Sequence, residues 1–100
     1  MKSDSQTTNV ADTLAERGAR YGKFNGHAAI TQTLKHNMRG LGIVGATTNW
    51  ARLSNSQQEA LEMIAHKIGR ILNGDPNYAD SWHDIAGYAK LVEDEINAGQ

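Results

Sequence analysis

The chain has 100 residues, a length typical of one domain with a small hydrophobic core. Its formal net charge of -1 argues against non-specific nucleic-acid binding, and the absence of cysteine excludes disulfides and thiolate metal sites. Apolar residues make up 39% of the sequence and aromatic residues 6%, which are low values for a chain that must stabilise itself. We therefore expect a homo-oligomer, in which further copies supply the missing burial.

The first nine residues are polar and show no apolar periodicity. We predict that residues 1–9 are disordered and that residues 10–100 form a single helical domain. The N-terminal segment lacks the apolar stretch of a secretory signal, and no later apolar run has the length of a membrane span. With no cysteine in the sequence, these features predict a cytoplasmic protein with no membrane partner.

Two short helices are predicted in the first 40 residues. Apolar residues at helical spacing, beginning with Val10 and Leu14, predict a helix over 10–19. A clearer apolar stripe predicts a second helix over 24–38. The glycine-rich segment 40–45 breaks this pattern and is expected to form a flexible connector.

Two longer helices are predicted in the second half of the chain. The pattern Ser56-Gln-Gln-Glu59 is typical of a capping box and predicts the start of a third helix. The helix is expected to end at Asn73-Gly74-Asp75-Pro76, because glycine and proline stop helices. A fourth helix is predicted from about residue 77 or 79 to residue 96. The stripe expected to form its core face consists of Trp82, Ile85, Ala89, Val92 and Ile96.

The order of these elements predicts the fold class. No strand-like alternation of apolar and polar residues is present. The short turn between the two long helices favours antiparallel packing. We therefore predict an all-α fold, a small helical bundle in which two short helices precede a long antiparallel helical hairpin.

Charges of both signs are expected to meet at the turn of this hairpin. Lys67 and Arg70 lie near the end of the third helix, and Asp80 and Asp84 lie near the start of the fourth. One interpretation is that these residues form inter-helix salt bridges that fix the register of the hairpin. The other is a ligand site, in which the cations bind phosphate and the aspartates orient them or read the ligand.

The flank of the fourth helix that carries the two aspartates is not a typical solvated face. It includes Gly87, Tyr88 and Leu91, and a glycine inside a helix usually has a packing reason. We therefore expect this flank to meet another surface.

A second basic cluster follows the first predicted helix. Arg17, Arg20 and Lys23 surround Tyr21. Nucleobases stack on tyrosine and phosphates pair with arginine, so this composition suits a nucleotide. The alternative is a helix C-terminus with favourable cations on an ordinary surface.

The carboxylates allow a metal-dependent alternative. Glu59, Glu62, Asp80 and Asp84 could hold Mg²⁺, which prefers oxygen ligands. However, antiparallel packing would place the two glutamates at the opposite end of the hairpin from the aspartates. We therefore expect no metal cofactor unless the chain is an enzyme. The histidines lack zinc-motif spacing, and no phosphate-binding P-loop is present.

Several segments between residues 14 and 96 resemble a small, uncharacterised family carried by tailed phages and prophages. They are Glu16-Arg17, Tyr21-Gly22, Lys67-Ile-Gly-Arg70 and Asp80-Ser-Trp-His-Asp-Ile-Ala-Gly-Tyr88, of which the last is the most specific. More distantly, the arrangement is similar to MazG-like all-α nucleotide pyrophosphohydrolases and to phage domains associated with nucleotide modification.

The MazG-like resemblance covers only part of that family's metal motif. MazG-like enzymes pair Glu-x-x-Glu on one helix with Glu-x-x-Asp on the next to hold Mg²⁺. Glu59-x-x-Glu62 matches the first half, whereas Asp80-x-x-x-Asp84 departs from the second. This departure favours nucleotide binding without turnover, so whether the chain is an enzyme stays open.

The sequence thus leads to one main functional hypothesis and two alternatives. The main hypothesis is a phage-encoded protein that binds a nucleotide or nucleotide-derived small molecule, to sequester a host defence messenger or to serve phage nucleotide metabolism. The predicted ligand-binding residues are Arg17, Tyr21, Lys67, Arg70, Asp80, Asp84 and Tyr88. The alternatives are a Mg²⁺-dependent nucleotide pyrophosphohydrolase and a module that binds a host protein through the 40–45 connector and the acidic flank.

Overall fold

The computed structural model describes residues 9–40 and 49–99, and the secondary structure within these ranges is entirely helical. In chain order the elements are α1 (Val10–Tyr21), α2 (Phe24–Met38), the 3-10 turn η2 (Trp50–Arg52), α3 (Asn55–Asn73) and α4 (Ala79–Asn97). The predicted all-α class and small bundle are therefore confirmed for the described residues. Residues 1–8 and 41–45 of the two predicted irregular segments lie outside these ranges. No described helix combines the length and hydropathy needed to span a bilayer.

Side-chain caps fix where the helices begin. The side chain of Asn9 accepts a hydrogen bond from the backbone N–H of Asp12 and starts α1. At the start of α3, Ser54 and Gln57 form a reciprocal capping box. The prediction placed this box two residues too late, at Ser56. The error arose because overlapping Ser-x-x-Gln and Ser-x-x-Glu patterns satisfy the same rule.

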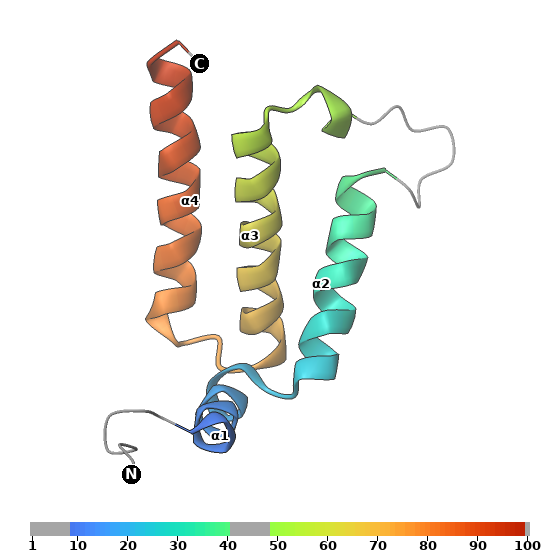
Figure 1. Ribbon diagram of the computed structural model, residues 1–100, viewed down its shortest axis with the longest axis vertical. Helices are drawn as coiled ribbons and strands as arrows, with labels where there is room; N and C mark the ends of the chain where they lie inside the picture. The colour runs from blue at the N-terminus through green and yellow to red at the C-terminus, as the bar shows by residue number, and fades with distance from the viewer. Residues whose placement is uncertain (1–8, 41–48, 100) are drawn as a thin grey trace.

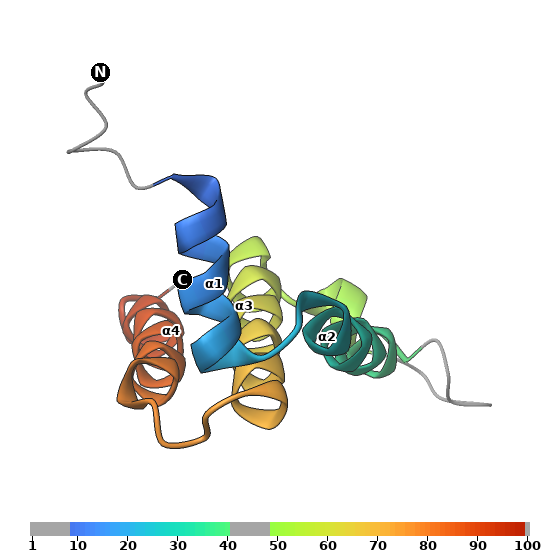
Figure 2. The ribbon, with the colours of Figure 1, turned by 90° about the horizontal axis from the view of Figure 1, so that it is seen from below.

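The long helices form one layer with α3 in its middle. Helix α3 packs against α2 on one side and α4 on the other. Figure 1 shows the three helices side by side, with the end of α3 and the start of α4 joined by the short segment 74–78. Helix α1 crosses one end of this layer and projects from one of its faces (Figures 1 and 2).

Hydrogen bonds join the bend that follows α1 to the bend that follows α3, at the point where α1 meets the layer. The side-chain amide of Asn73 donates hydrogen bonds to the backbone oxygens of Tyr21, at 2.7 Å, and Lys23, at 2.8 Å. The backbone N–H of Asp75 donates to the oxygen of Arg20 at 2.7 Å. Gly74 lies so close to Arg20 that a Cβ atom there would overlap its backbone oxygen. These contacts hold the last turn of α1 against the last turn of α3.

The apolar core is small. Among the described residues, the only buried hydrophobic side chains are Ala60 and Ala65, both on α3. The core stripe predicted for α4 is only partly packed, since Trp82 is 55% exposed and Ile96 is 53% exposed. Trp82 is therefore not the core anchor that its position in the stripe predicted.

Candidate functional site: a cationic cavity between α1 and α3

A cavity of about 580 Å³ lies where α1, the start of α2 and the end of α3 meet. Three of its lining residues are cations, namely Arg17, Lys23 and Arg70, and no carboxylate is among the described residues that line it. The other side chains are mainly apolar or aromatic. They belong to Leu14, Tyr21, Phe24, His27 and His66. The cavity therefore combines positive charge with ring-shaped and aliphatic surface.

An arginine–tyrosine stack forms one wall of this cavity. The guanidinium carbon of Arg70 lies 4.0 Å from the centre of the Tyr21 ring, a cation–π geometry. The Tyr21 ring in turn meets the edge of the Tyr78 ring at a centroid distance of 6.0 Å. These contacts fix the direction of the Arg70 side chain without neutralising its charge.

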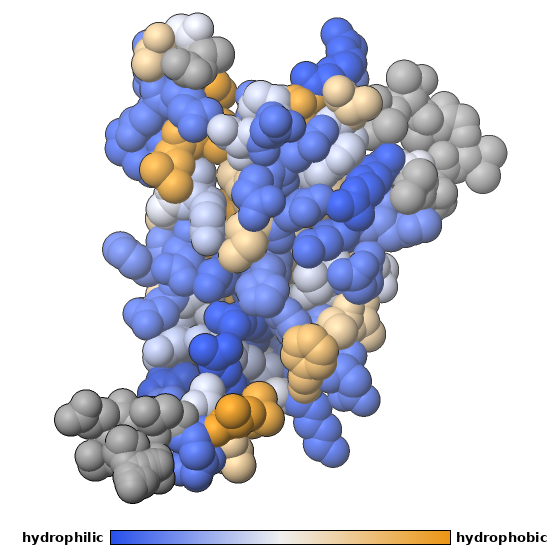
Figure 3. Space-filling view, viewed as in Figure 1, coloured by the Kyte–Doolittle hydropathy of each residue, from blue (hydrophilic) through white to orange (hydrophobic). Residues whose placement is uncertain are grey.

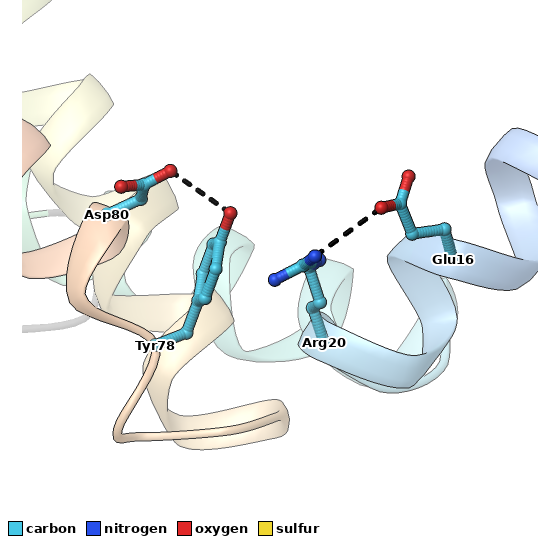
Figure 4. A network of polar contacts seen from close by, with 4 residues as sticks. All are labelled: Glu16, Arg20, Tyr78 and Asp80. Atoms are coloured by element: carbon cyan, nitrogen blue, oxygen red, sulfur yellow. Dashed lines mark hydrogen bonds and ion pairs between the residues drawn. The ribbon is translucent and has the colours of Figure 1, made fainter.

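A smaller cleft of about 180 Å³ adjoins the cavity and shares Arg17, Tyr21 and Arg70 with it. Figure 4 shows Arg20 between two partners in this region. Arg20 pairs with Glu16 at 3.4 Å, and its guanidinium carbon lies 4.4 Å from the centre of the Tyr78 ring. The positive charge of Arg20 is thus already shared with a carboxylate, unlike the charges that line the larger cavity.

Two histidines form the inner edge of the cavity. His27 is buried, and its Nε2 atom lies 3.3 Å from Nδ1 of His66 and 3.4 Å from the Thr31 hydroxyl. Burial, followed by the positive charges of Arg70 and neighbouring cations, lowers the pKa of His66 to about 4. The same causes lower the pKa of His27, with burial the larger. Both rings are therefore neutral at pH 7.

The predicted meeting of α3 cations with α4 carboxylates is realised by one pair. The ammonium of Lys67 lies 2.8 Å from Asp84, and the Lys67 side chain is only 11% exposed. This hydrogen bond and the adjacent positive charge lower the pKa of Asp84. The salt-bridge interpretation thus describes Lys67 and Asp84, which do not line the cationic cavity.

The remaining predicted ligand residues separate into three places. Arg17, Tyr21 and Arg70 lie together in the cavity wall. Asp80 is exposed and accepts a hydrogen bond from the Tyr78 hydroxyl at 3.0 Å, which raises the pKa of Tyr78. Tyr88 lies two turns further along α4, in a groove beside the start of α3. The structure therefore does not bring all seven predicted residues to one site.

The carboxylates proposed for a metal site are also separated. Glu62 forms an ion pair with Arg39, just beyond α2, whereas Asp84 pairs with Lys67 on the other side of α3. Within residues 9–40 and 49–99, no group of three or more potential metal-ligating side chains forms. The described part of the chain thus offers no ready octahedral oxygen cage for Mg²⁺.

The expectation that the aspartate flank of α4 meets another surface holds only in part among the described residues. Asp84 pairs with Lys67 of α3, and Tyr88 is half-buried beside the start of α3, whereas Gly87 and Leu91 on the same flank are open. A Cβ atom added to Gly87 would have no neighbour within 4 Å outside its own helix. Leu91 on the same flank is 61% exposed. The helical glycine therefore has no packing role in the single described chain.

Sequence reasoning missed His66 and Tyr78 as members of this region. Helical spacing places His66 opposite the apolar stripe of the third helix, which is typical of a polar surface residue. Its partner is His27, 39 positions earlier, and only the packing of α2 on α3 brings them together. No local signal in the sequence identifies such a pair.

Comparison with known families adds one finding to this geometry. Residues 8–96 match a family model described as "Domain of unknown function (DUF6378)". The chain belongs to this family. The DUF6378 match covers α1, α2, α3 and all of α4 except Asn97, so every residue that lines the cavity lies within the family domain. No curated protein and no solved structure matches the chain.

Proposed function

We propose that the protein binds a nucleotide or a nucleotide-derived small molecule in the cationic cavity. The observation that carries this proposal is the lining, which includes three cations and aromatic side chains but no carboxylate among the described residues. Phosphate groups pair with arginine, and nucleobases stack on aromatic rings and guanidinium planes. A volume of about 580 Å³ also falls within the range of small-molecule sites, roughly 300–1,000 Å³.

The cavity suggests an orientation for the ligand. Arg17 and Arg70 line both the larger cavity and the small polar cleft, so they lie at the boundary between them. A phosphate group at this boundary would meet both guanidinium groups. The base would then lie in the larger cavity, against Leu14 and Phe24, where the lining is apolar.

The biological setting that we propose follows from the resemblance to phage-encoded proteins. In that setting the protein either sequesters a nucleotide messenger of host defence or serves phage nucleotide metabolism, in the host cytoplasm. We further propose that it acts as a homo-oligomer. Binding without turnover is favoured over Mg²⁺-dependent hydrolysis because the four candidate carboxylates are not grouped in the described chain.

Calorimetric titration with a panel of nucleoside mono-, di- and triphosphates and cyclic dinucleotides tests the proposal. We expect saturable binding of at least one nucleotide to the wild type and weaker binding to Arg17→Gln. The matched control is Arg52→Gln, since Arg52 lies on η2 and does not line the cavity. Intact ligand recovered after denaturation supports binding without turnover, whereas phosphate release with Mg²⁺ would favour the enzyme. Binding by no nucleotide would contradict the proposal and favour the protein-interaction alternative.

A further inference from the structure

The apolar residues of the two long helices repeat with the period of a helix–helix seam. On α3, Leu61, Ile64, Ile68 and Ile71 follow spacings of three, four and three residues. On α4 the spacings are three, four, three and four, through Trp82, Ile85, Ala89, Val92 and Ile96. Alternating spacings of three and four are the heptad pattern of helices that pack along their length. One such seam joins α3 to α4, but the stripes are wider than that contact.

The ion pair between Lys67 and Asp84 indicates which side of the helix layer the exposed part of each apolar stripe faces. Each residue advances about 100° around a helix, so Leu61, Ile68 and Leu72 lie roughly 100–140° from Lys67. Trp82, Ala89 and Ile96 lie roughly 120–160° from Asp84 on α4. Lys67 and Asp84 pair on one side of the two helices, so both apolar groups face the other side.

We call this surface the rear face, defined by Leu61, Ile68 and Leu72 of α3 and by Trp82, Ala89 and Ile96 of α4. It lies away from α1, because Arg70, which contacts α1, is roughly 160° from Leu72 around α3. Figure 3 shows the side from which α1 projects, which is mostly hydrophilic. None of the residues that define the rear face is charged, and Glu93, about 20° from Trp82 around α4, borders it.

Large apolar side chains of the rear face are open to solvent. Leu72 is 66% exposed, Trp82 is 55% exposed and Ile96 is 53% exposed. Trp82 and Ile96 occupy core positions of the heptad pattern, and Leu72 follows the last such position on α3, yet the described chain leaves more than half of each residue exposed. Charge depletion together with exposed aliphatic and aromatic surface is typical of the centre of a permanent interface.

We propose that the rear face is the contact surface of a symmetric homodimer, in which α3 and α4 of two copies form a four-helix core. A second copy is favoured over another protein because the chain's own core is deficient, so the partner must be present whenever the chain folds. A twofold symmetric contact needs only one surface patch that is complementary to itself. The rear face can be such a patch, because apolar side chains at heptad spacing can pack against the same side chains of a second copy. The cationic cavities of the two copies then lie on the outer faces, where both stay open.

Substitutions on the two flanks of α4 and on α3 test this proposal. Sedimentation velocity of the wild type at tens of micromolar is expected to give a mass of about twice 10.9 kDa. Leu72→Glu and Ile96→Glu place a charge on the rear face and are expected to weaken dimerisation at least tenfold. Leu91→Glu is the matched control, because Leu91 is similarly exposed but lies on the aspartate flank. It is expected to leave the dimer intact.

A second measurement covers variants that fail to fold. For a dimer that unfolds to separate chains, the melting temperature of the wild type rises with protein concentration. A wild type that is monomeric, with a melting temperature independent of concentration, would overturn the proposal and leave the rear face to a different partner. A wild-type dimer that Leu91→Glu disrupts and Leu72→Glu leaves intact would overturn the choice of face.

Discussion

Arg70 is held over the ring of Tyr21, with its guanidinium carbon 4.0 Å from the ring centre, at the boundary between the large cavity and the polar cleft. The stack orients the cation but leaves its hydrogen-bond donors unused by any carboxylate in the lining of the large cavity. An anionic ligand can therefore meet Arg70 without first breaking an ion pair. This separates Arg70 from Lys67, whose charge is already paired with Asp84.

Replacement of Arg70 by Gln is expected to weaken nucleotide binding by roughly tenfold to a hundredfold, the effect of losing one charge-assisted hydrogen-bonding group of about 1.5–3 kcal/mol. The melting temperature is expected to fall only modestly, because a half-buried cation–π contact is worth about 0.5–2 kcal/mol. Calorimetric titration and thermal unfolding measure the two effects. Equal loss of stability with unchanged affinity would show that Arg70 is only a structural residue.

The Lys67–Asp84 pair is expected to respond asymmetrically to substitution. Asp84→Asn leaves the almost buried Lys67 ammonium without its counter-charge, whereas Lys67→Met leaves a carboxylate that is 42% exposed and can be hydrated. We therefore expect Asp84→Asn to lower the urea midpoint of unfolding more than Lys67→Met does. Nucleotide affinity should be the same in both variants as in the wild type. A loss of nucleotide affinity as large as that of Arg70→Gln would contradict this expectation and show that Lys67 and Asp84 contribute to ligand binding.

The His27–His66 pair predicts a loss of stability in acid. The pKa of His66 is about 4 in the folded chain, below its ordinary value of 6.5, so the unfolded chain binds the proton more readily. The contribution of neutral His66 to the free energy of unfolding is therefore complete above pH 6.5, and it is lost as the pH decreases from 6.5 towards 4.

Urea unfolding of His66→Gln at several pH values checks this assignment. The slope of stability against pH between 6.5 and 4 is expected to be shallower than in the wild type. His36→Gln serves as the control, since His36 is exposed on α2. Slopes that are the same in all three proteins would show that the histidine pair does not couple folding to protonation.

Two helical glycines are expected to respond in opposite directions to alanine. A Cβ atom at Gly69 would overlap the Thr31 hydroxyl and crowd the His27 ring, so Gly69→Ala should destabilise the fold by about 1–3 kcal/mol. A Cβ atom at Gly87 meets nothing, so Gly87→Ala should stabilise α4 by about 0.5–1 kcal/mol. Chemical denaturation measures both changes, and Thr31→Ala combined with Gly69→Ala should recover part of the loss. A destabilised Gly87→Ala variant would instead reveal a partner packed on that flank.

The sequence predicted the helices well because each carries its own local signal. The amphipathic stripe over 24–38 matches α2 residue for residue, and the stop at Asn73 matches the end of α3. The capping box was displaced because two serines compete for the same pattern, and only the backbone conformation at Ser54 decides between them.

The candidate site was predicted in part, for a related reason. Residue chemistry identified Arg17, Tyr21 and Arg70, but the expected antiparallel hairpin placed Arg70 beside the aspartates of the fourth helix. The true neighbour of Arg70 is α1, which reaches it through the hydrogen bonds of Asn73 to backbone oxygens 50 and 52 positions earlier. Contacts between a side chain and a distant backbone leave no periodic signal, because any residue supplies the backbone oxygen.

The hydrogen bonds from Asn73 to the backbone oxygens of Tyr21 and Lys23 also determine how α1 can move. Helix α1 has no buried residue, and hydrogen bonds to the rest of the fold are concentrated at its last turn. Helix α1 is therefore attached to the rest of the fold only at its C-terminal end. Its backbone amides should exchange with solvent slowly near Tyr21 and progressively faster towards Val10. A ligand bound in the cavity between Leu14 and the two histidines would hold the N-terminal part of α1 in place and slow amide exchange along the whole helix.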